Sequence, residues 1–423
     1  MRTNGYSAIL TTLLASFVLA LLISGTHASA QTEKLLYSFN NNGTDGNGPE
    51  GALVFDTQGN LYGATTLGGP NLAGTVFELA PQTGGAWQET ILHTFNGLLG
   101  TPPNNGQNPE AGLIIDAAGN LYGTTYYGGL HDLGTAFKLT HQTGGSWLET
   151  IMYSMQSGES GQCPVGGLVL DSSGRLYGTT SDRLCGGTSK GVVFEVAPNV
   201  SGGWSKKTLH HFDSTTNDGT YPTGSLIFDK AGNLYGTTTE GGTSTNCTGG
   251  CGTVFELSKG AGGAWTETIL YNFTNGTDGY FPAYGVVMDA AGNLYGTANG
   301  GRYLDGTVFE LSPVTGGGWT ETTLYTFTSG KDGELPNGVV LNGGNLYGTT
   351  QQGGTNGEGT VFELTPATGG GWTETIIHNF FDKNNNDGMY PVSSLVFDSA
   401  GNLYGTATAG GTYGDGVVFE ITP

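Results

Sequence analysis

The chain has 423 residues and a formal net charge of −22 at pH 7, because 35 acidic side chains outnumber 13 Lys and Arg. So few basic residues exclude nucleic acid as the expected partner, and leave open a neutral glycan, a cation, a basic partner or solubility alone. Charged residues are only 11% and Gly fills 78 positions, which is typical of many tight turns between short strands rather than of helices.

The first thirty residues have the features of a secretory signal peptide. Arg2 provides a short basic region, residues 8–23 form an apolar run, and residues 28–30 form a small-x-small cleavage site. We expect residues 1–30 to be removed and the mature chain, 31–423, to be secreted, extracellular or periplasmic, without a membrane span. An uncleaved anchor is the alternative, but the apolar run is short for a span of about 20 residues.

A Leu-Tyr-Gly core recurs seven times in the rest of the chain. The copies begin at Leu61, Leu121, Leu176, Leu234, Leu294, Leu346 and Leu403. They are 52 to 60 residues apart, which indicates tandem units that are too small to bury a core alone and must pack on one another. Residues 31–423 are therefore expected to form one domain despite their length.

Each unit contains four short segments that are rich in β-branched and aromatic residues and bounded by Gly, Pro or Asn. Representative copies are residues 112–116, 60–65, 74–79 and 265–273. Such segments are typical of strands joined by hairpins. Seven units of four antiparallel strands predict an all-β fold, a single seven-bladed β-propeller. A parallel solenoid is the alternative, but its coils are much shorter than this repeat.

Residue size changes across each unit as a wheel of blades requires. The position that opens the first segment is always small: Ala52, Gly112, Gly167, Ser225, Gly285, Gly338 and Ser394. The position that opens the fourth segment is Trp in six units: Trp87, Trp147, Trp204, Trp265, Trp319 and Trp372. We therefore place the first segments at the crowded axis and the fourth at the periphery, where more volume must be filled.

The missing fourth strand of the last unit is expected at the other end of the chain. Residues 33–39 match the fourth segment at residues 89–95, whereas the last unit stops straight after its third segment, 416–421. Pairing of the N-terminal strand with the last blade would close the ring and remove exposed edges that invite aggregation.

The repeated motifs resemble those of a known family. Asp-x-x-Gly-Asn-Leu-Tyr-Gly-Thr-Thr, Gly-Thr-Val-Phe-Glu-Leu and Trp-Thr-Glu-Thr-Ile-Leu resemble the GloVer tandem repeat of bacterial choice-of-anchor surface proteins, over residues 33–423. Pro-x-x-Gly-Leu-Val-x-Asp followed by Gly-Asn-Leu-Tyr is more distantly similar to NHL and SMP-30-like propellers. The first resemblance implies an exported repeat protein of undetermined activity, often with a C-terminal sorting signal. Residues 421–423 end the chain without a hydrophobic tail, so we expect free secretion.

Residues that differ between units are the candidates for function, because residues common to all units serve the fold. In a propeller, the loops between second and third strands share a face with the loops that join blades, and binding residues belong on such loops. Aromatic and charged groups there could stack on sugars and hydrogen-bond their hydroxyls; ordinary solvated loop tips are the alternative. The candidate ligand-binding residues are Tyr126, Tyr127, His131, Asp132, Arg183, Arg302, Tyr303, Asp305, Tyr413 and Asp415.

The loops between blades end in a recurring Asp-Gly-x-x-Pro motif. Its Asp is Asp45, Asp218, Asp278, Asp332 or Asp387. In residues 382–388, oxygen ligands alternate before a Gly, as in the first half of a calcium loop. The candidate calcium ligands are Asp382, Asn384, Asn386 and Asp387. The bidentate Glu of an EF-hand is missing, and a turn whose carboxylate accepts backbone N–H bonds explains the motif without metal. Calcium stays open, and no other cofactor is expected.

Two further recurring sets are expected to be structural, so no catalytic residue is assigned. An Asp precedes the turn between the first two segments of six units, where it can cap its own turn: Asp56, Asp116, Asp171, Asp229, Asp289 and Asp398. His93, His210 and His378 occupy a position that is Tyr in other units, and we expect them to pack as aromatics rather than to act as ligands.

The four cysteines suggest two disulfides, as expected for an exported chain. A hairpin that turns at residues 172–173 would bring Cys163 opposite Cys185, which makes this pair geometrically plausible. Cys247 and Cys251 lie in one loop and could staple it. A four-thiolate zinc site is the alternative, and the sequence does not exclude the other two pairings.

Three functions remain open. The leading hypothesis is a monomeric binding or adhesion module that uses the variable loop face for a polysaccharide or a protein partner. The second is a lyase or hydrolase at the channel mouth, which would need convergent groups from several blades. Its candidates are His131, Asp132, Arg183, Arg302 and Asp305. The third is a structural matrix component, which would need an exposed apolar patch that the sequence does not supply.

Overall fold

The computed structural model describes residues 32–97, 105–157, 161–183, 185–187, 189–213, 217–303, 305–328, 330–381 and 387–422. The expected signal peptide, residues 1–30, and most of the expected calcium loop lie outside these ranges. Within them, no helix is long and apolar enough to cross a bilayer.

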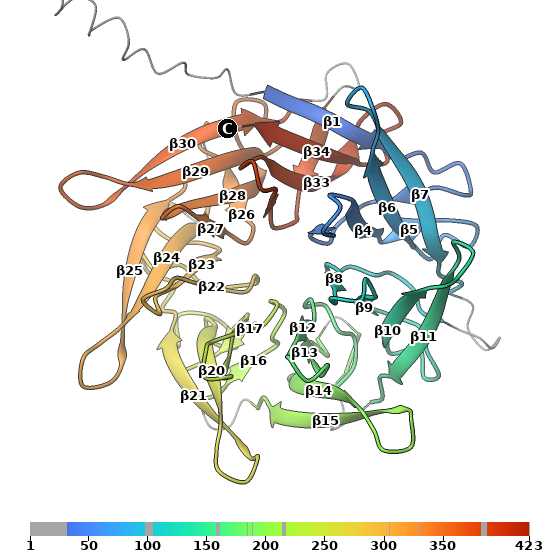
Figure 1. Ribbon diagram of the computed structural model, residues 1–423. Helices are drawn as coiled ribbons and strands as arrows, with labels where there is room; N and C mark the ends of the chain where they lie inside the picture. Colours follow the sequence, from blue (N-terminus) through green and yellow to red (C-terminus); the bar gives the residue numbers. More distant parts are fainter. Residues whose placement is uncertain are drawn as a thin grey trace, which may run out of the picture.

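Seven antiparallel sheets stand around a central axis and form a seven-bladed β-propeller, as the repeats predict (Figure 1). Blades 1 to 3 consist of β3 (Val54–Phe55), β4 (Leu61–Thr65), β6 (Thr75–Pro81) and β7 (Trp87–Thr94); β8 (Ile114–Ile115), β9 (Leu121–Thr125), β10 (Thr135–His141) and β11 (Trp147–Ser154); and β12 (Val169–Leu170), β13 (Leu176–Thr180), β14 (Val192–Pro198) and β15 (Trp204–His211).

Blades 4 to 6 consist of β17 (Ile227–Phe228), β18 (Leu234–Thr238), β20 (Thr253–Lys259) and β21 (Trp265–Asn272); β22 (Val287–Met288), β23 (Leu294–Ala298), β24 (Thr307–Pro313) and β25 (Trp319–Thr326); and β27 (Val340–Asn342), β28 (Asn345–Gln352), β29 (Thr360–Pro366) and β30 (Trp372–Asn379). Blade 7 consists of β32 (Val396–Phe397), β33 (Leu403–Gly410), β34 (Val417–Thr422) and β1 (Thr32–Ser38).

The ring is closed by β1, as predicted. It pairs antiparallel with β34, with Thr32 opposite Thr422 and Ser38 opposite Val417, and it forms the outer edge of blade 7 (Figure 1). Its register shifts at Leu35, and the third and fourth strands of the other blades have the same irregularity. The N-terminal strand thus reproduces a complete fourth strand, and β34 is paired on both sides as the third strands of the other blades are.

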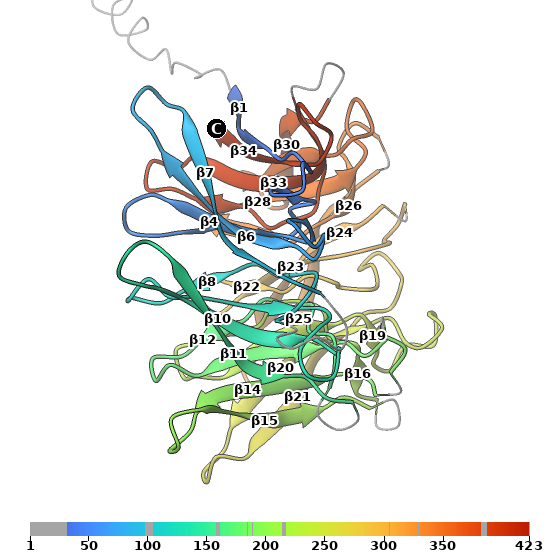
Figure 2. The ribbon, with the colours of Figure 1, turned by 90° about the vertical axis from the view of Figure 1, so that its right-hand side faces the viewer.

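The loops that join blades pair with the loops between second and third strands, so both sets lie on one face. Short ladders make these pairs: β2 (Gly46–Asn47) with β5 (Leu67–Gly68), β16 (Gly219–Thr220) with β19 (Glu240–Gly241), β26 (Glu334–Pro336) with β28, and β31 (Gly388–Pro391) with β33. Figure 2 shows β16 and β19 on one side of the ring, away from the long hairpin of β6 and β7. We call this side the loop face.

Buried phenylalanines fill the space between neighbouring blades. Phe39 from the end of one fourth strand meets Phe77 of the next blade with ring centres 5.1 Å apart, and both rings are fully buried. The same edge-to-face pair recurs at five other junctions. The Gly of each Leu-Tyr-Gly core makes room for this ring: a Cβ on Gly63 would lie 2.5 Å from Phe77 Cζ.

The fourth-strand tryptophans lie at the periphery, half-buried, as their size predicts. Four of the six pack against the core Tyr of the preceding blade; for example, the ring centres of Trp87 and Tyr404 are 6.3 Å apart, and Trp147 meets Tyr62 in the same way. Aromatic contacts therefore join the blades at two radii, Phe pairs inside and Trp–Tyr pairs outside, each contributing about 0.5–1.5 kcal/mol beyond burial.

The Asp before each first turn is structural, as predicted. Oδ1 of Asp56 accepts hydrogen bonds from the backbone N–H of Gln58 and Asn60 at 2.8 and 2.9 Å, and Oδ2 accepts one from Asn60 Nδ2. The same backbone pattern recurs at Asp116, Asp171, Asp229, Asp289 and Asp398. In the sixth unit, which has Asn342 here, Asn345 and Tyr347 bind Glu363 instead.

Both expected disulfides are present. Cys163 is bonded to Cys185 and Cys247 to Cys251, with Cα atoms 6.4 and 5.2 Å apart. The first joins the two sides of the innermost hairpin of blade 3, and the second staples the loop between the second and third strands of blade 4.

Candidate functional site

A cavity of about 860 Å³ runs along the axis and is lined by residues in or just before the first strands of all seven blades. This volume falls within the roughly 300–1,000 Å³ of small-ligand sites. The seven small residues predicted at the axis all border it: Ala52, Gly112, Gly167, Ser225, Gly285, Gly338 and Ser394. Small side chains at the axis therefore leave an open channel rather than a packed centre.

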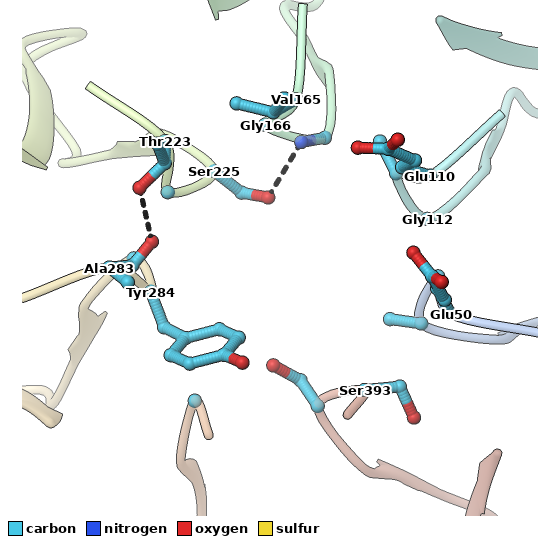
Figure 3. Close-up of a pocket in the computed structure, with 18 of the residues that line it drawn as sticks. Glu50, Glu110, Gly112, Val165, Gly166, Thr223, Ser225, Ala283, Tyr284 and Ser393 are labelled. Carbon is cyan, nitrogen blue, oxygen red and sulfur yellow. Dashed lines mark hydrogen bonds between the residues drawn. The ribbon is translucent and has the colours of Figure 1, made fainter. Parts of the chain in front are cut away.

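Two glutamates project into one side of this cavity (Figure 3). Glu50 and Glu110 each follow the Pro that ends the loop between blades, and they come from neighbouring blades 1 and 2. Burial, and secondly the charge of Glu50, raises the pKa of Glu110 to about 7. Burial also raises the pKa of Glu50. The pair can therefore hold a proton at neutral pH, so that it both donates and accepts hydrogen bonds.

A tyrosine from blade 5 faces the glutamates across the cavity (Figure 3). Tyr284 donates a hydrogen bond to Asn337 Oδ1 at 2.6 Å. Asn337 is fixed in turn, because its Nδ2 donates to Thr349 Oγ1 at 2.8 Å and to the Pro391 carbonyl at 2.7 Å. Burial, and secondly the charge of Glu50, raises the pKa of Tyr284 to about 12, so its hydroxyl stays protonated and can accept a bond from a ligand.

The residues just before those prolines form a row on the loop face, which we call the rim, and Phe281 among them borders the cavity itself. Six of them are not glycine yet have φ between 53° and 59°: Asn108, Cys163, Tyr221, Phe281, Leu335 and Tyr390. A hydrogen bond to the previous blade holds each in this left-handed conformation; for example, Phe281 N donates to the Cys251 carbonyl at 2.9 Å and Tyr221 N to the Lys190 carbonyl at 2.7 Å. Such backbone is uncommon for bulky residues and is concentrated at functional sites.

Aromatic and cationic groups gather on this rim at blades 3 to 5. The Arg183 guanidinium lies 5.6 Å from the Tyr221 ring centre and 5.9 Å from that of Phe281, and it pairs with Glu240. Lys190 Nζ donates to the Tyr221 hydroxyl at 2.7 Å. We call Arg183, Lys190, Tyr221 and Phe281 the mouth cluster; Arg183 and Phe281 border the cavity directly.

Of the ten residues that the sequence singled out, only Arg183 borders the cavity. Tyr126 is buried against Tyr127, with ring centres 4.5 Å apart. The other candidates lie on the loops of the same face, and those exposed at loop tips are His131, Arg302, Tyr303 and Tyr413.

Two of the acidic candidates accept hydrogen bonds from loops of this face, and the third is buried. Asp132 accepts a bond from Gly128 N at 3.1 Å. Asp415 accepts from Asn41 N and from Asn47 Nδ2, both at 3.0 Å. The side chain of Asp305 is buried.

The calcium candidates Asp382, Asn384 and Asn386 lie outside the described residues. Asp387 accepts bonds from Phe381 N at 2.9 Å and from Gly388 N at 2.7 Å. The equivalent Asp45 accepts from the Tyr37 hydroxyl and from Asn40 N, both at 2.9 Å. The Asp-Gly motif therefore forms a hydrogen-bonded turn in the loops between blades.

Sequence reasoning missed most of the residues around the cavity. The missed residues are Glu50, Glu110, Lys190, Tyr221, Phe281 and Tyr284. A signal was present, because the two positions after the Pro vary between units: Glu-Gly, Glu-Ala, Val-Gly, Thr-Gly, Ala-Tyr, Asn-Gly and Val-Ser. Positions that vary between units therefore lie on the cavity wall as well as on the loops.

Comparison with known proteins supports the fold and the repeat. No curated protein matches the chain. Similar solved structures include a protein from Lactobacillus plantarum, with 14% identity, a TM-score of 0.48 and an alignment that covers 81% of this chain and 86% of that one. Another is a luciferin-regenerating enzyme, with 14% identity, a TM-score of 0.43 and coverage of 74% of this chain and 90% of that one. A third is a PL25 ulvan lyase bound to -[GlcA(1-4)Rha3S]-, with 12% identity, a TM-score of 0.54 and coverage of 90% of this chain and 95% of that one. The ulvan lyase alone of these three superposes above a TM-score of 0.5, and at this identity it supports the propeller fold only.

The Gloeobacter/Verrucomicrobia repeat model matches residues 23–249 and 243–423. These ranges contain all seven Leu-Tyr-Gly cores and every blade, in agreement with the motifs in the sequence. The chain therefore belongs to the Gloeobacter/Verrucomicrobia repeat family.

Proposed function

We propose that this protein is an exported binding module that takes a neutral polysaccharide at the mouth of its central channel. The proposal rests on the mouth cluster, which places two aromatic rings and a guanidinium group at the rim of a cavity of about 860 Å³. Export is proposed from the expected signal peptide and is supported by the two disulfides.

The chemistry of the site suits sugars. Tyr221 and Phe281 offer apolar faces on which a pyranose ring can stack. Deeper in the cavity, Glu50, Tyr284 and Ser393 offer hydroxyl and carboxyl groups to sugar hydroxyls (Figure 3). Because each neutral polar group in the cavity can donate and accept, a polyhydroxylated ligand could replace the water hydrogen bonds it loses on entry.

Charge favours a neutral glycan over an acidic one. The chain carries a net charge of −22, so a strongly anionic polymer is repelled at long range. Arg183 would be the natural partner of a uronate, but it is already paired with Glu240. The ulvan lyase binds a uronate-containing glycan in a propeller of the same general shape, which supports only the idea that this architecture can hold a polysaccharide.

The test is retention of the mature chain, residues 31–423, on neutral and acidic polysaccharides, with the supernatant assayed for released sugars. We expect retention on a neutral polysaccharide. Phe281→Ala and Tyr221→Ala should each weaken it about tenfold, the factor that corresponds to about 1.4 kcal/mol of lost stacking. Tyr390→Ala is the matched control, because Tyr390 has the same place in the repeat and a φ of 58° but lies on β31, before blade 7 and apart from the mouth cluster at blades 3 to 5. Equal loss in all three variants, or no retention on neutral polysaccharides, would contradict the proposal.

A hydrolase or lyase is the second candidate, and the pair Glu50 and Glu110 favours it. A carboxyl group with a pKa near 7 can act as a general acid while its neighbour acts as a base. If the retained glycan is also cleaved, Glu110→Gln should abolish the release of sugar and leave binding intact. Release that survives this substitution would exclude the pair as the acid and base.

A further inference from the structure

A second cluster of polar groups lies at the outer rim, where blade 3 meets blade 4. His210 lies on β15, Glu267 lies on the adjacent β21 (Figure 1), and Asp218 lies in the loop that joins the two blades, just before β16. The His210 side chain is 21% exposed, that of Glu267 13% and that of Asp218 6%. The cluster is therefore largely shielded from solvent and does not belong to the channel.

The spacing of the three side chains matches a metal site. His210 Nε2 lies 3.0 Å from Asp218 Oδ2 and 3.6 Å from Glu267 Oε2, and one nitrogen and two carboxylate oxygens all lie within 4.8 Å of one another. Zinc binds such atoms at about 2.0–2.2 Å, so ligands of a tetrahedral ion are about 3.3–3.6 Å apart. One ion can therefore contact all three after small side-chain shifts.

Unsatisfied oxygens provide the second observation. Asp218 Oδ1 and Glu267 Oε1 are buried and have no hydrogen-bond partner. The Glu oxygen is also unpaired at equivalent positions of four other blades, whereas the unpaired Asp oxygen distinguishes the turn of Asp218. Asp218 Oδ2 accepts a bond from Asp213 N at 3.2 Å and lies 3.0 Å from His210 Nε2, so neither contact satisfies Oδ1. A buried, unpaired carboxylate oxygen is costly, and a divalent cation that contacts both oxygens of Asp218 would remove that cost.

The equivalent positions of other blades show that this junction is different. At three junctions Tyr replaces the His, and Tyr37, Tyr271 and Tyr325 donate to the loop Asp at 2.9, 3.0 and 3.0 Å. At a fourth junction His93 meets Asn105, which replaces the Asp. At a fifth, Lys206 replaces the Glu. At the remaining junction His378, Asp387 and Glu33 are residues of the same three types. Among the described residues, however, only the group at His210 brings three ligand atoms within 4.8 Å of one another. The Tyr hydroxyl donates a hydrogen bond to the Asp of the turn, whereas a neutral His imidazole at this position can also bind a metal.

We propose that His210, Asp218 and Glu267 bind one divalent transition-metal ion, of which Zn²⁺ is the best fit, as a clamp between blades 3 and 4. A nitrogen and two carboxylates suit zinc better than calcium, which takes six to eight oxygen ligands. Asp218 lies three residues before Tyr221 in the same loop, so the ion would also fix the backbone that carries this residue of the mouth cluster. His210, expected from sequence to be a packing aromatic, becomes a ligand in this proposal.

The experiment measures Zn²⁺ uptake by the mature chain after dialysis against a chelator, by competition with a chromophoric chelator. We expect one equivalent to bind, and its affinity to fall as the pH is lowered because protons compete for the ligands. His210→Tyr should remove this equivalent. The fold should tolerate it, because Tyr occupies the same repeat position in four other units. Asp218→Asn, which copies the natural Asn105, should weaken binding at least tenfold.

His378→Tyr is the matched control, because His378 has the same place in the repeat and lies 3.1 Å from Asp387. It should bind Zn²⁺ like the parent, and Zn²⁺ should raise the thermal midpoint of both but not of His210→Tyr. Absence of uptake by the parent, or equal uptake by His210→Tyr, would overturn the proposal. Because no glycan enters this assay, its outcome is independent of the proposed function of the channel.

Discussion

Replacing Glu149 by Gln should stabilise the protein at pH 8 but not at pH 5. Glu149 lies on β11, half-buried, with Oε2 3.5 Å from His93 Nε2 and Oε1 buried without a partner. Burial raises the pKa of Glu149 to about 8 and lowers the pKa of His93 to about 4. Both groups are therefore neutral over most of the range between these values, and their contact is not an ion pair there.

The sign follows from proton linkage. The folded-state pKa of about 8 lies above the unfolded value of 4.5, so the unfolded chain loses its proton first as the pH rises. Glu149 therefore costs stability progressively between pH 4.5 and pH 8, at up to about 1.4 kcal/mol per pH unit. The side chain keeps 12% of its surface exposed and solvent reduces the cost, so we expect about 2 kcal/mol at pH 8. Gln cannot ionise and removes this cost.

The measurement is urea unfolding followed by tryptophan fluorescence at pH 5, 6, 7 and 8. The free energy of unfolding of Glu149→Gln minus that of the parent should be near zero at pH 5 and grow toward pH 8. Glu321→Gln is the matched control, because Glu321 has the same place in blade 5 but accepts a bond from Thr323 Oγ1 at 2.9 Å. Its difference should grow less. A difference for Glu149→Gln that is constant with pH, or larger at pH 5, would refute the reasoning.

Three further predictions concern the scaffold. Deletion of residues 31–39 removes β1 and exposes β34, so the variant should aggregate; a soluble monomer on gel filtration, as stable as the parent, would contradict ring closure. Gly63→Ala places a Cβ 2.5 Å from Phe77 Cζ and 2.8 Å from Leu53 Cδ2, so thermal unfolding should show a loss of about 1–3 kcal/mol, and an unchanged midpoint would contradict this packing. Cys185→Ser opens a loop of 22 residues and Cys251→Ser one of 4. The first should lower the free energy of unfolding by about 3 kcal/mol and the second by less. The reverse order in urea unfolding would contradict the assignment.

The sequence predicts the scaffold because the residue pattern that specifies each part of a blade recurs from unit to unit. Trp87 and its copies specify the periphery, Gly112 and its copies specify the axis, and residues 33–39 complete the last blade. The site is less predictable because its residues meet only after the ring closes. Glu50 and Tyr284 are more than 230 residues apart in sequence and come together only across the channel.

The rim of the site also departs from a local rule. A residue before Pro normally adopts extended backbone, which gives no reason to expect a row of side chains at one height on the loop face. In the structure, Tyr221 and Phe281 have φ of 59° and 57°, because each N–H is bound to a carbonyl of the previous blade. A contact between blades thus decides the conformation, and no reading of a single unit contains that contact.

The departures from the repeat in blades 3 and 4 support the mouth cluster residue by residue. The disulfide of Cys185 constrains the chain two residues after Arg183. The disulfide of Cys251 fixes the segment whose carbonyl accepts the Phe281 N–H at 2.9 Å, and the proposed metal ligand Asp218 lies in the loop of Tyr221. Two disulfides and the proposed metal clamp would therefore hold three residues of one rim. Such restraint lowers the conformational entropy that a binding site loses when its ligand arrives, which is the reason a propeller already stabilised by six buried Phe pairs would place additional cross-links here.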